Sequence, residues 1–528
     1  MVGGAIDRVF ERRVASLVNA RVPELLRGGL RGLEKESLRV TPSGRIARTP
    51  HPVAIGSALC HPHITTDYSE ALLELVTSPS ADNDTLLSEL RTLQAFVCRQ
   101  LGDELLWPAS MPCELSGDAD VPIAYYGRSH EGHFKEVYRR GLLHRYGGMM
   151  QAIAGVHFNY SLPTGFWPVW AEVREVRAAD SAFVSSSYME LLRNFRRHGW
   201  LVSWLFGASP ALCRSFAADS TGLRNHAART LYGPASTSLR MSDLGYRNRD
   251  QAAVHVSVNS LDAYLRDLQR AVHTPHPPFE RIGVRVDGEY RQLSANVLQI
   301  ENEYYSAIRP KRAPRSGELA AQALGRAGVE YVEVRTLDLD LFAPDAVTVE
   351  QLDFLEALLI LLLVKDSPLL ADDEQQDLDA NQLQVCREGR ASGLLLRRDG
   401  RALALRDWAA RLFDELTAVC ELLDAGHPGG RYGRALQAQR DKLAQPLLLP
   451  SARQQQQLLD HGEEFSAQAM RLAQQHRDVL LATPLEPALL AQLQAQARES
   501  IELQQRMDRA VSGDFGEYLH RRLSGAAA

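Results

Sequence analysis

Residues 32–40 read Gly-Leu-Glu-Lys-Glu-Ser-Leu-Arg-Val, and the two acidic residues of this stretch are two positions apart. Alternation of this kind is typical of a β-strand, because successive side chains of a strand point to opposite faces of the sheet. It places Glu34 and Glu36 side by side on one face. Neighbouring carboxylates repel each other unless water, an opposite charge or a bound cation compensates. The stretch therefore predicts a strand with one acidic face.

Three further segments alternate in the same way: residues 70–77 (EALLELVT), 155–162 (GVHFNYSL) and 330–337 (EYVEVRTL). They present Glu74, His157 and Glu333, the last sharing its face with Arg335. The simplest assembly of four such segments is an antiparallel sheet with one face packed on helices and the other facing a polar cavity. The sequence lacks the strand-borne GxGxxG pattern that a doubly wound dinucleotide-binding sheet would carry.

The second part of the sequence is different in character. From about residue 346 it is rich in Leu, Ala, Gln, Arg and Glu, which predicts long amphipathic helices. The best helix candidates are residues 349–364, 403–423, 431–443, 452–481 and 487–512. We therefore expect an α+β catalytic body over residues 1–345 and a helical C-terminal portion over residues 346–528 packed on it.

Composition excludes several classes of protein. The 528 residues include 59 basic and 65 acidic ones, so the net charge of −6 argues against binding nucleic acid through bulk positive charge. The longest apolar run, residues 357–364, is much shorter than the ~20 residues that cross a membrane. Six cysteines without a CxxC spacing, and an N-terminus without a secretory signal, favour the reducing cytoplasm.

The chain has five lysines against 54 arginines and contains no Gly-Lys pair, so the phosphate-binding P-loop is absent. Any bound phosphate must be neutralised by arginines or by metal ions held on carboxylates. Residues 308–312 (IRPKR) form the one dense basic cluster, which is either a solvated loop or a phosphate site. Residues 60–63 (CHPH) resemble a zinc cluster, but the proline between the histidines favours a turn.

Acidic residues on several strand faces suggest a divalent cation. Mg²⁺ and Mn²⁺ prefer oxygen ligands and bridge to substrate phosphates. For any single glutamate, a solvated or salt-bridged position is the more common situation. Four segments that all present Asp, Glu, His or Arg make a shared site the better interpretation.

Eight stretches, in order over about residues 30–345, resemble the glutamate–cysteine ligases (γ-glutamylcysteine synthetases) of the proteobacterial type. They are residues 31–40 (RGLEKESLRV), 64–77 (ITTDYSEALLELVT), 107–113 (WPASMPC), 155–163 (GVHFNYSLP), 205–210 (LFGASP), 237–246 (TSLRMSDLGY), 296–312 (NVLQIENEYYSAIRPKR) and 329–338 (VEYVEVRTLD). The helical remainder resembles the family in length and character without a sharp motif.

The resemblance implies a fold like the catalytic domain of glutamine synthetase, in which a curved antiparallel sheet forms a funnel with helices outside. It implies that ATP phosphorylates the γ-carboxylate of L-glutamate and that the amine of L-cysteine attacks the acyl phosphate. The products are γ-glutamylcysteine, ADP and phosphate, in the first step of glutathione synthesis. ATP is then a co-substrate and Mg²⁺ the metal, with Mn²⁺ as an alternative. We expect a cytoplasmic monomer that binds these small molecules and neither nucleic acid nor membrane.

The resemblance also implies residue roles by motif position. The implied metal ligands are Glu34, Glu36, Asp67, Glu74, His157 and Glu333. Arg335 is expected to hold the transferring phosphate, with assistance from Arg139. The acceptor cysteine pocket is expected to contain Tyr68, Tyr138, Leu142, Tyr246 and Tyr305, with Arg240 nearby for a carboxylate, and the glutamate side Gln151 and Ile153. Tyr68 stands where the family pattern leads us to expect Phe.

Two alternatives accompany this prediction. The first is a carboxylate–amine ligase with another acceptor, although an aromatic pocket argues against a charged diamine. The second is a non-catalytic nucleotide or metabolite sensor on the same fold. Such a sensor usually lacks a metal ligand or the phosphate arginine, and this sequence contains all of them.

Overall fold

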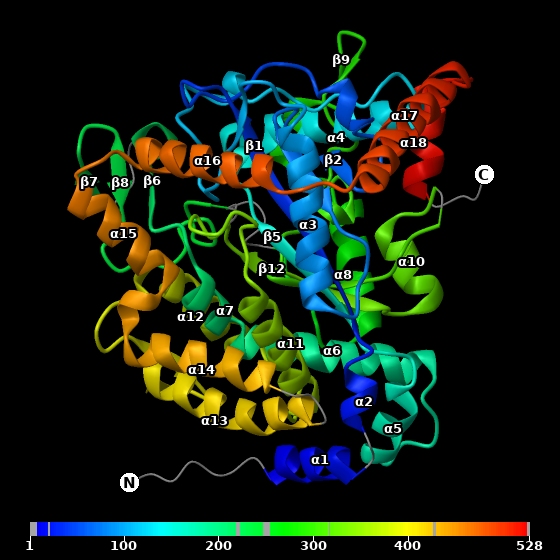
Figure 1. Ribbon diagram of the computed structural model, residues 1–528. Helices are drawn as coiled ribbons and strands as arrows, with labels where there is room; N and C mark the ends of the chain where they lie inside the picture. Colours follow the sequence, from blue (N-terminus) through cyan, green and yellow to red (C-terminus); the bar gives the residue numbers. More distant parts are fainter. Residues whose placement is uncertain are drawn as a thin grey trace.

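All four predicted strand segments lie in one antiparallel sheet of the computed structural model (Figure 1). The structure describes residues 8–19, 22–217, 222–245, 254–315, 317–425 and 429–524. The strands of the sheet are β1 (Leu30–Val40), β2 (Ile64–Thr66), β3 (Leu72–Val76), β4 (Leu105–Leu106), β5 (Val156–Ser161), β11 (Ile308–Lys311) and β12 (Tyr331–Leu337). Their order is β11–β12–β5–β1–β3–β2, and β4 pairs with the end of β1.

The strand register brings the polar residues of neighbouring strands to the same face. Directly opposite residues in an antiparallel pair share a face and are close enough for their side chains to interact. The cross-strand pairs on this face are Glu34–His157, Glu36–Glu74 and Glu333–Asn159. One sheet face therefore collects the acidic side chains of β1, β3 and β12 around His157 and Asn159 of β5.

Helices cover the opposite face of the sheet. Helix α3 (Asn83–Cys98) packs on β1 and β3, while α6 (Ser181–His198) and α7 (Trp200–Phe206) pack on β11 and β12. The ammonium of Lys35, between the two glutamates of β1, donates to Gln94 Oε1 of α3 at 2.7 Å. The alternation within β1 thus separates a packed face from an acidic face.

Helix α11 (Val349–Val364) is the central helix of the core. Its residues 351–364 are all buried, and it packs on α3, α6, α13 and α14. Its Glu356 lies in a buried network with Arg31 at the start of β1: Arg31 Nε donates to Glu356 Oε2 at 3.1 Å, and the Tyr432 hydroxyl donates to the same oxygen at 2.8 Å. The network joins the sheet to the helical C-terminal portion, since Tyr432 belongs to α14.

The remaining helices surround this centre. Those of the first part are α1 (Arg8–Asn19), α2 (Val22–Leu26), α4 (His130–Tyr146), α5 (Phe166–Val173), α8 (Leu261–His273), α9 (Pro277–Ile282) and α10 (Ala320–Ala327). Those that follow α11 are α12 (Asp372–Glu388), α13 (Leu405–Asp424), α14 (Arg431–Ala444), α15 (Pro450–His461), α16 (Phe465–Ala482), α17 (Pro487–Arg509) and α18 (Phe515–Ser524). Small sheets pair β6 (Ala211–Cys213) and β7 (Arg224–His226) with β8 (Thr230–Tyr232), β9 (Arg285–Val286) with β10 (Glu289–Tyr290), and β13 (Leu395–Arg398) with β14 (Arg401–Ala404).

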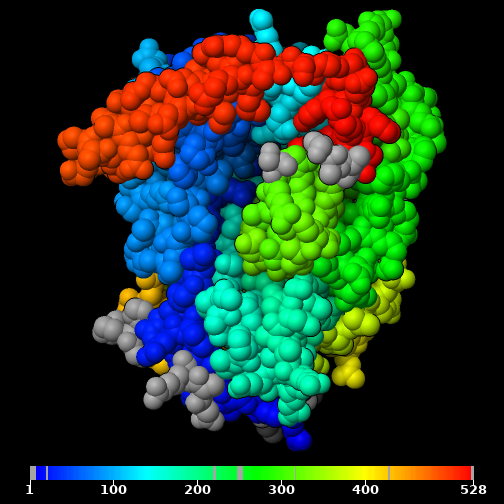
Figure 2. All heavy atoms as spheres, turned by 90° about the vertical axis from the view of Figure 1, so that its right-hand side faces the viewer, coloured from blue at the N-terminus to red at the C-terminus, as the bar shows by residue number. Residues whose placement is uncertain are grey.

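The C-terminal helices return to the N-terminal part of the chain. Helix α16 packs on α3 and β4, and α17 packs on the short helix at Val53–Ile55. Figure 2 shows the orange and red end of the chain crossing the top of the molecule above blue and cyan segments. The division at residue 345 stays a prediction. No helix within the described ranges has both the length and the apolar character needed to cross a bilayer.

One helix prediction was wrong. The segment 452–481 forms two helices, α15 and α16, because the chain turns at Gly462, whose φ of +61° is a left-handed conformation that glycine adopts without strain. The sequence analysis also missed α12 and the β13–β14 hairpin. Helices α11, α13, α14 and α17 begin within two residues of their predicted starts.

The predicted turn at residues 60–63 contains a buried histidine that must be neutral. Nδ1 of His61 accepts hydrogen bonds from the backbone N–H groups of His63 at 3.1 Å and Ile64 at 3.0 Å. A ring nitrogen that accepts two hydrogen bonds cannot carry a proton. Burial, with a contribution from His63, lowers the pKa of His61 to about 4.

We expect His61 to make the protein sensitive to acid. Because its pKa is about 4 in the folded state and ~6.5 in an unfolded chain, the unfolded state takes up the proton first, and the free energy of unfolding falls as pH drops from 6.5 towards 4. His61→Asn keeps an acceptor oxygen that does not titrate. Urea unfolding between pH 8 and pH 4.5 should show a weaker pH dependence in this variant. Substitution of the exposed His520 by Asn serves as the control, and equal pH dependence in His61→Asn and wild type would contradict the prediction.

Candidate active site

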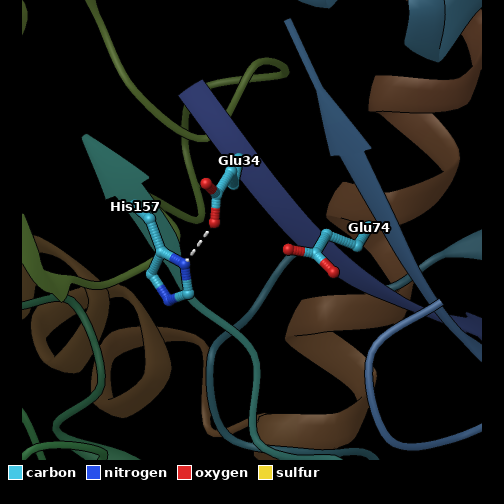
Figure 3. A group of neighbouring side chains, drawn as sticks. All are labelled: Glu34, Glu74 and His157. Carbon is cyan, nitrogen blue, oxygen red and sulfur yellow. Dashed lines mark hydrogen bonds and ion pairs between the residues drawn. The ribbon is translucent and has the colours of Figure 1, made fainter. Parts of the chain in front are cut away.

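The centre of the acidic sheet face is a group of three side chains from three neighbouring strands. Glu34 of β1, Glu74 of β3 and His157 of β5 each offer one ligand atom, and these atoms lie within 4.8 Å of one another. Figure 3 shows the Glu34 carboxylate pointing at the imidazole, with Glu74 approaching from the other side of β1. The distance between Glu34 Oε2 and His157 Nδ1 is 2.9 Å.

Two more glutamates extend this group, which we call the carboxylate cluster (Glu34, Glu36, Glu74, His157 and Glu333). Glu36 Oε1 lies 4.0 Å from His157 Nε2, and Glu333 Oε1 lies 3.8 Å from Nδ1. Asp67, in the turn after β2, is close enough to raise the pKa of both Glu36 and Glu74. The structure thus brings five of the six predicted metal ligands together and places Asp67 near Glu36 and Glu74.

Hydrogen bonds orient the two glutamates of β1. Asn159 lies two residues beyond His157 on the same face of β5, and its side-chain amide donates to Glu34 Oε1 at 3.0 Å. The backbone N–H of Gly155 donates to Glu36 Oε2 at 2.7 Å. Both oxygens of Glu34 are therefore engaged by β5 side chains, whereas Glu36 has one oxygen held by a backbone N–H.

The four glutamates of the cluster form two pairs, one with raised and one with lowered pKa values. Burial raises the pKa of Glu74 well above its ordinary value, and the nearby Glu34, Asp67 and Glu36 add to the effect. Burial also raises the pKa of Glu36. On the other side, burial opposes the ionisation of Glu34 and Glu333. The hydrogen bond from His157 nevertheless lowers the pKa of Glu34, and Lys311 and Arg335 hold that of Glu333 well below its ordinary range.

Two cations flank Glu333. Lys311 Nζ lies 3.1 Å from Oε1, and Arg335 Nη1 lies 3.2 Å from Oε2. Lys311 comes from β11, the edge strand next to β12, and Arg335 is two residues beyond Glu333 on β12 itself. The end of the cluster at Glu333 is therefore the place where positive charge gathers.

Arg240 is bound to the backbone of Arg335. Its Nη2 donates to the backbone carbonyl of Arg335 at 3.0 Å, and its Nη1 lies 3.6 Å from Asp338 Oδ1. The guanidinium crosses Gly155 so closely that a Cβ there would be 1.9 Å from Nη2. The absence of a side chain at Gly155 thus leaves room for the Arg240 guanidinium. The backbone N–H of the same glycine binds Glu36.

The predicted acceptor residues fall into two groups, one on or near α4 and the other around Tyr305. On α4, the Arg139 guanidinium donates to the backbone carbonyl of Asp67 and lies 4.6 Å from the ring centre of Tyr126. Tyr138 is its neighbour on α4, and Tyr68 follows Asp67 directly. On the other side, the Tyr305 hydroxyl donates to Met241 Sδ at 3.0 Å.

The other predicted substrate residues are placed by their elements. Leu142 is buried on α4, one turn beyond Tyr138. Gln151 lies in the short helix Met149–Ala152, and Ile153 follows it on the way to Gly155. Tyr246 lies outside the described residues.

A cavity of about 510 Å³ adjoins Tyr305 and Met241. Its lining includes Tyr304, residues 254–259 and the Arg196 side chain of α6. This volume is within the range of small-molecule sites. Space for a ligand thus exists on the Tyr305 side of the carboxylate cluster.

The donor set of the cluster suits a hard divalent cation. Carboxylate oxygens predominate and one imidazole completes the group, which matches Mg²⁺ or Mn²⁺ better than a thiolate-seeking metal. Burial raises the pKa of Glu36 and of Glu74, so their ionisation requires compensating positive charge. A cation between the strands would supply it.

Comparison with known proteins assigns this arrangement to a family. The family model described as glutamate-cysteine ligase matches residues 14–385, well over half of the sequence. The chain belongs to the glutamate–cysteine ligase family. Membership in the glutamate–cysteine ligase family confirms the predicted resemblance and the predicted activity, the ATP-dependent formation of γ-glutamylcysteine as the first step of glutathione synthesis.

Similar proteins span nearly the whole chain. The glutamate–cysteine ligase of Azotobacter vinelandii is 47% identical over 519 residues, which cover 97% of this chain and 98% of that protein. The glutamate–cysteine ligase of Janthinobacterium sp. is 44% identical over 515 residues, which cover 97% of this chain and 98% of that protein. A crystal structure of the Francisella tularensis glutamate–cysteine ligase in complex with AMP has a TM-score of 0.89 at 34% identity and covers 94% of this chain and 98% of that one. This match confirms the predicted fold class, an antiparallel sheet with flanking helices and a helical C-terminal portion.

Sequence reasoning missed three contributors to the site. Asn159, two residues beyond His157 in the same alternating stretch, and Gly155, at the start of that stretch, were given no role. Lys311 was grouped with the whole basic stretch 308–312, which the structure divides: Arg309 and Lys311 lie on the Glu333 side of β11, whereas Arg312 interacts with Gly328 and Glu330. The signal was present in the alternation of arginine and lysine at positions 309 and 311.

We expect Gly155→Ala to impair activity more than stability. The added methyl group would displace Arg240, whose Nη2 would be only 1.9 Å from the Cβ, and would disturb the N–H that holds Glu36. The ratio kcat/KM should fall about tenfold or more, which corresponds to ~1.4 kcal/mol of transition-state stabilisation. Gly325→Ala is the matched control, since its nearest contact would be an ordinary 3.7 Å. Wild-type kcat/KM in Gly155→Ala, with melting temperatures measured in parallel, would refute the close approach.

Proposed function

We propose that the carboxylate cluster and its two flanking cations form the site at which the γ-carboxylate of L-glutamate is phosphorylated by ATP and then transferred to L-cysteine. The observation that carries this proposal is the convergence of Glu34, Glu74 and His157 beside the Lys311–Glu333–Arg335 group. The AMP bound to the Francisella relative supports the use of an adenine nucleotide.

The reaction has two steps with balanced chemistry. First, an oxygen of the γ-carboxylate forms a bond to the γ-phosphorus of ATP while the bond from that phosphorus to the ADP oxygen breaks, giving γ-glutamyl phosphate and ADP. The cysteine nitrogen then forms a bond to the acyl carbon, phosphate leaves with the C–O bond electrons, and the amine loses a proton. Catalysis of this kind depends on positioning and on the stabilisation of charge.

The proposed metal ligands are the cluster residues together with Asp67. Bound Mg²⁺ or Mn²⁺ would supply a Lewis acid that neutralises charge on phosphate and carboxylate oxygens. In the protein alone, Lys311 and Arg335 both contact Glu333. The Lys311 ammonium and the Arg335 guanidinium therefore already lie at the cluster, where they can donate hydrogen bonds to phosphoryl oxygens.

The substrate residues take roles that follow from their places. We assign the Arg335 fork to the transferring phosphoryl group, because a guanidinium matches its planar set of oxygens. Arg139 is proposed to assist from α4, and Arg240 to bind an amino-acid carboxylate. Tyr68, Tyr138, Leu142 and Tyr305 are proposed for the acceptor side, where aromatic rings suit a thiol, and Gln151 and Ile153 for the glutamate side.

The proposed setting is the cytoplasm, with a monomer as the active unit. Among the residues that the structure describes, the cysteines form no disulfide, in keeping with a reducing compartment. The residues proposed for catalysis all come from a single chain, so a monomer can contain a complete site.

An assay of ADP release tests the function directly. With L-glutamate, ATP and Mg²⁺, turnover should require L-cysteine, and the product should be γ-glutamylcysteine by mass spectrometry. L-2-Aminobutyrate should replace L-cysteine, because it has the same backbone and a similar size, whereas simple amines should not. Turnover that is independent of L-cysteine at every Mg²⁺ and Mn²⁺ concentration would refute the proposed acceptor.

Glu36→Ala tests the cluster as the metal site. We expect a folded protein whose metal-dependent turnover falls by at least ~100-fold, since one oxygen ligand and its charge are lost. Isothermal titration with Mn²⁺ should show weaker binding, which is a readout independent of activity. Glu502→Ala, at an exposed position of α17, should behave like the wild-type protein. Unchanged Mn²⁺ affinity in Glu36→Ala would remove Glu36 from the ligand set.

A further inference from the structure

The last two helices of the chain hold the first half of α4, a helix that carries proposed substrate residues. Residues 508–522 contact α4 or its N-terminal cap from about 380 positions away in the sequence. In Figure 1, α17 and α18 lie beside α4 at the top right of the molecule. Their contacts with it are of three kinds.

The first contact caps the start of α4. Asp508 Oδ1, at the end of α17, accepts hydrogen bonds at 2.8 Å from the backbone N–H groups of Arg128 and Ser129. Ser129 is the N-cap residue of α4, and its hydroxyl accepts from the Gly132 N–H at 3.1 Å. A carboxylate at a helix N-terminus satisfies free N–H groups and interacts favourably with the helix dipole. Asp508 thus fixes where α4 begins.

The second contact is an apolar cluster separate from the main core. Its buried residues are Phe134, Val137, Leu293, Ile300 and Leu519, and Tyr138, Tyr290, Phe515, Tyr518 and Leu523 pack against them. The Phe515 ring centre lies 4.2 Å from that of His133, and the Tyr518 ring lies 5.2 Å from that of His130. Apolar packing, together with tilted and edge-on ring contacts, therefore joins α18 to α4.

The third contact is polar. Glu131 on the first turn of α4 accepts a hydrogen bond from the Tyr518 hydroxyl at 2.6 Å and lies 3.4 Å from Arg522 Nη2. The Arg522 guanidinium also lies over the Phe134 ring, 5.6 Å from its centre. Together with Asp508, these groups fix both the position and the rotation of α4.

Tyr138 connects this docking to the site. It packs on the same apolar cluster and follows Phe134 by one helical turn, so the two side chains are neighbours on α4. The next residue, Arg139, reaches the backbone carbonyl of Asp67. A small rotation of α4 would therefore move Tyr138, Arg139 and Leu142 together.

We propose that α18 is a positioning element for the acceptor side of the active site, with Phe515 and Tyr518 as its positioning residues. The proposal rests on the proposed function, because it uses the assignment of Tyr138 and Leu142 to the acceptor pocket. Arg139 moves with α4 but is proposed only to assist, whereas the principal phosphate-side residues, Lys311 and Arg335, come from β11 and β12. Loosening α18 should therefore affect L-cysteine more than ATP.

Steady-state kinetics and hydrogen–deuterium exchange test the proposal together. Phe515→Ala should raise the KM for L-cysteine by about tenfold, the equivalent of ~1.4 kcal/mol, with less than about a twofold change in the KM for ATP. The backbone amides of α4 should exchange faster, which is a readout that needs no turnover. Tyr518→Phe, which keeps the ring and loses the Glu131 hydrogen bond, should show both effects more weakly.

Met470→Ala provides the control. Met470 belongs to α16 in the same C-terminal portion, but its side chain packs against Gly44 rather than against α4. It should change neither α4 exchange nor the ratio of the two KM values. Equal increases in both KM values, a loss of kcat alone, or unchanged α4 exchange in Phe515→Ala would overturn the proposal. If the wild-type protein lacked cysteine-dependent turnover, the proposed function would fail, while α4 exchange would still decide whether α18 holds α4. Should Phe515→Ala fail to fold, Tyr518→Phe decides by the same measurements.

Discussion

Four glutamates share one largely buried sheet face, and like charges in such a place cannot all ionise without compensating positive charge. The protein meets this constraint unevenly. At one end, Lys311 and Arg335 contact both oxygens of Glu333. At the other end, burial raises the pKa of Glu36 and Glu74, and neither forms an ion pair with a lysine or arginine among the described contacts. This asymmetry is the basis for the proposal of a metal ion at one end and phosphate at the other.

The acidic face can be held in place because the opposite face of the sheet is fixed to the core. Lys35 points away from its two acidic neighbours and is bound by Gln94 on α3. Arg31, four residues before Lys35, is tied to α11 and α14 through Glu356 and Tyr432. A buried ion pair contributes little net stability, and removal of one partner is costly because it leaves an unpaired charge. The value of these contacts therefore lies in fixing the position of β1, on which Glu34 and Glu36 stand.

The sequence was most informative where a local pattern determines the structure. Alternation predicted β1, β3, β5 and β12, and it placed the acidic side chains on the correct faces, since a strand has a fixed period of two. Register is a long-range property, so the pairing of Glu36 with Glu74 could not be derived from the sequence. The same holds for Asn159 and Lys311, whose roles depend on neighbouring strands. The break at Gly462 was missed because glycine also occurs inside helices, and only its left-handed conformation ends α15.

The capping of α4 by Asp508 also constrains how the protein matures on the ribosome. The chain is made from its N-terminus, so residues 1–507 exist before the carboxylate that binds the N–H groups of Arg128 and Ser129. The acidic strands can pair early, whereas the helix beside them acquires its cap and its aromatic neighbours only when the last helices have emerged. Under the proposed residue roles, a nascent chain can therefore form the strands of the phosphate side before α4 gains its contacts with α17 and α18.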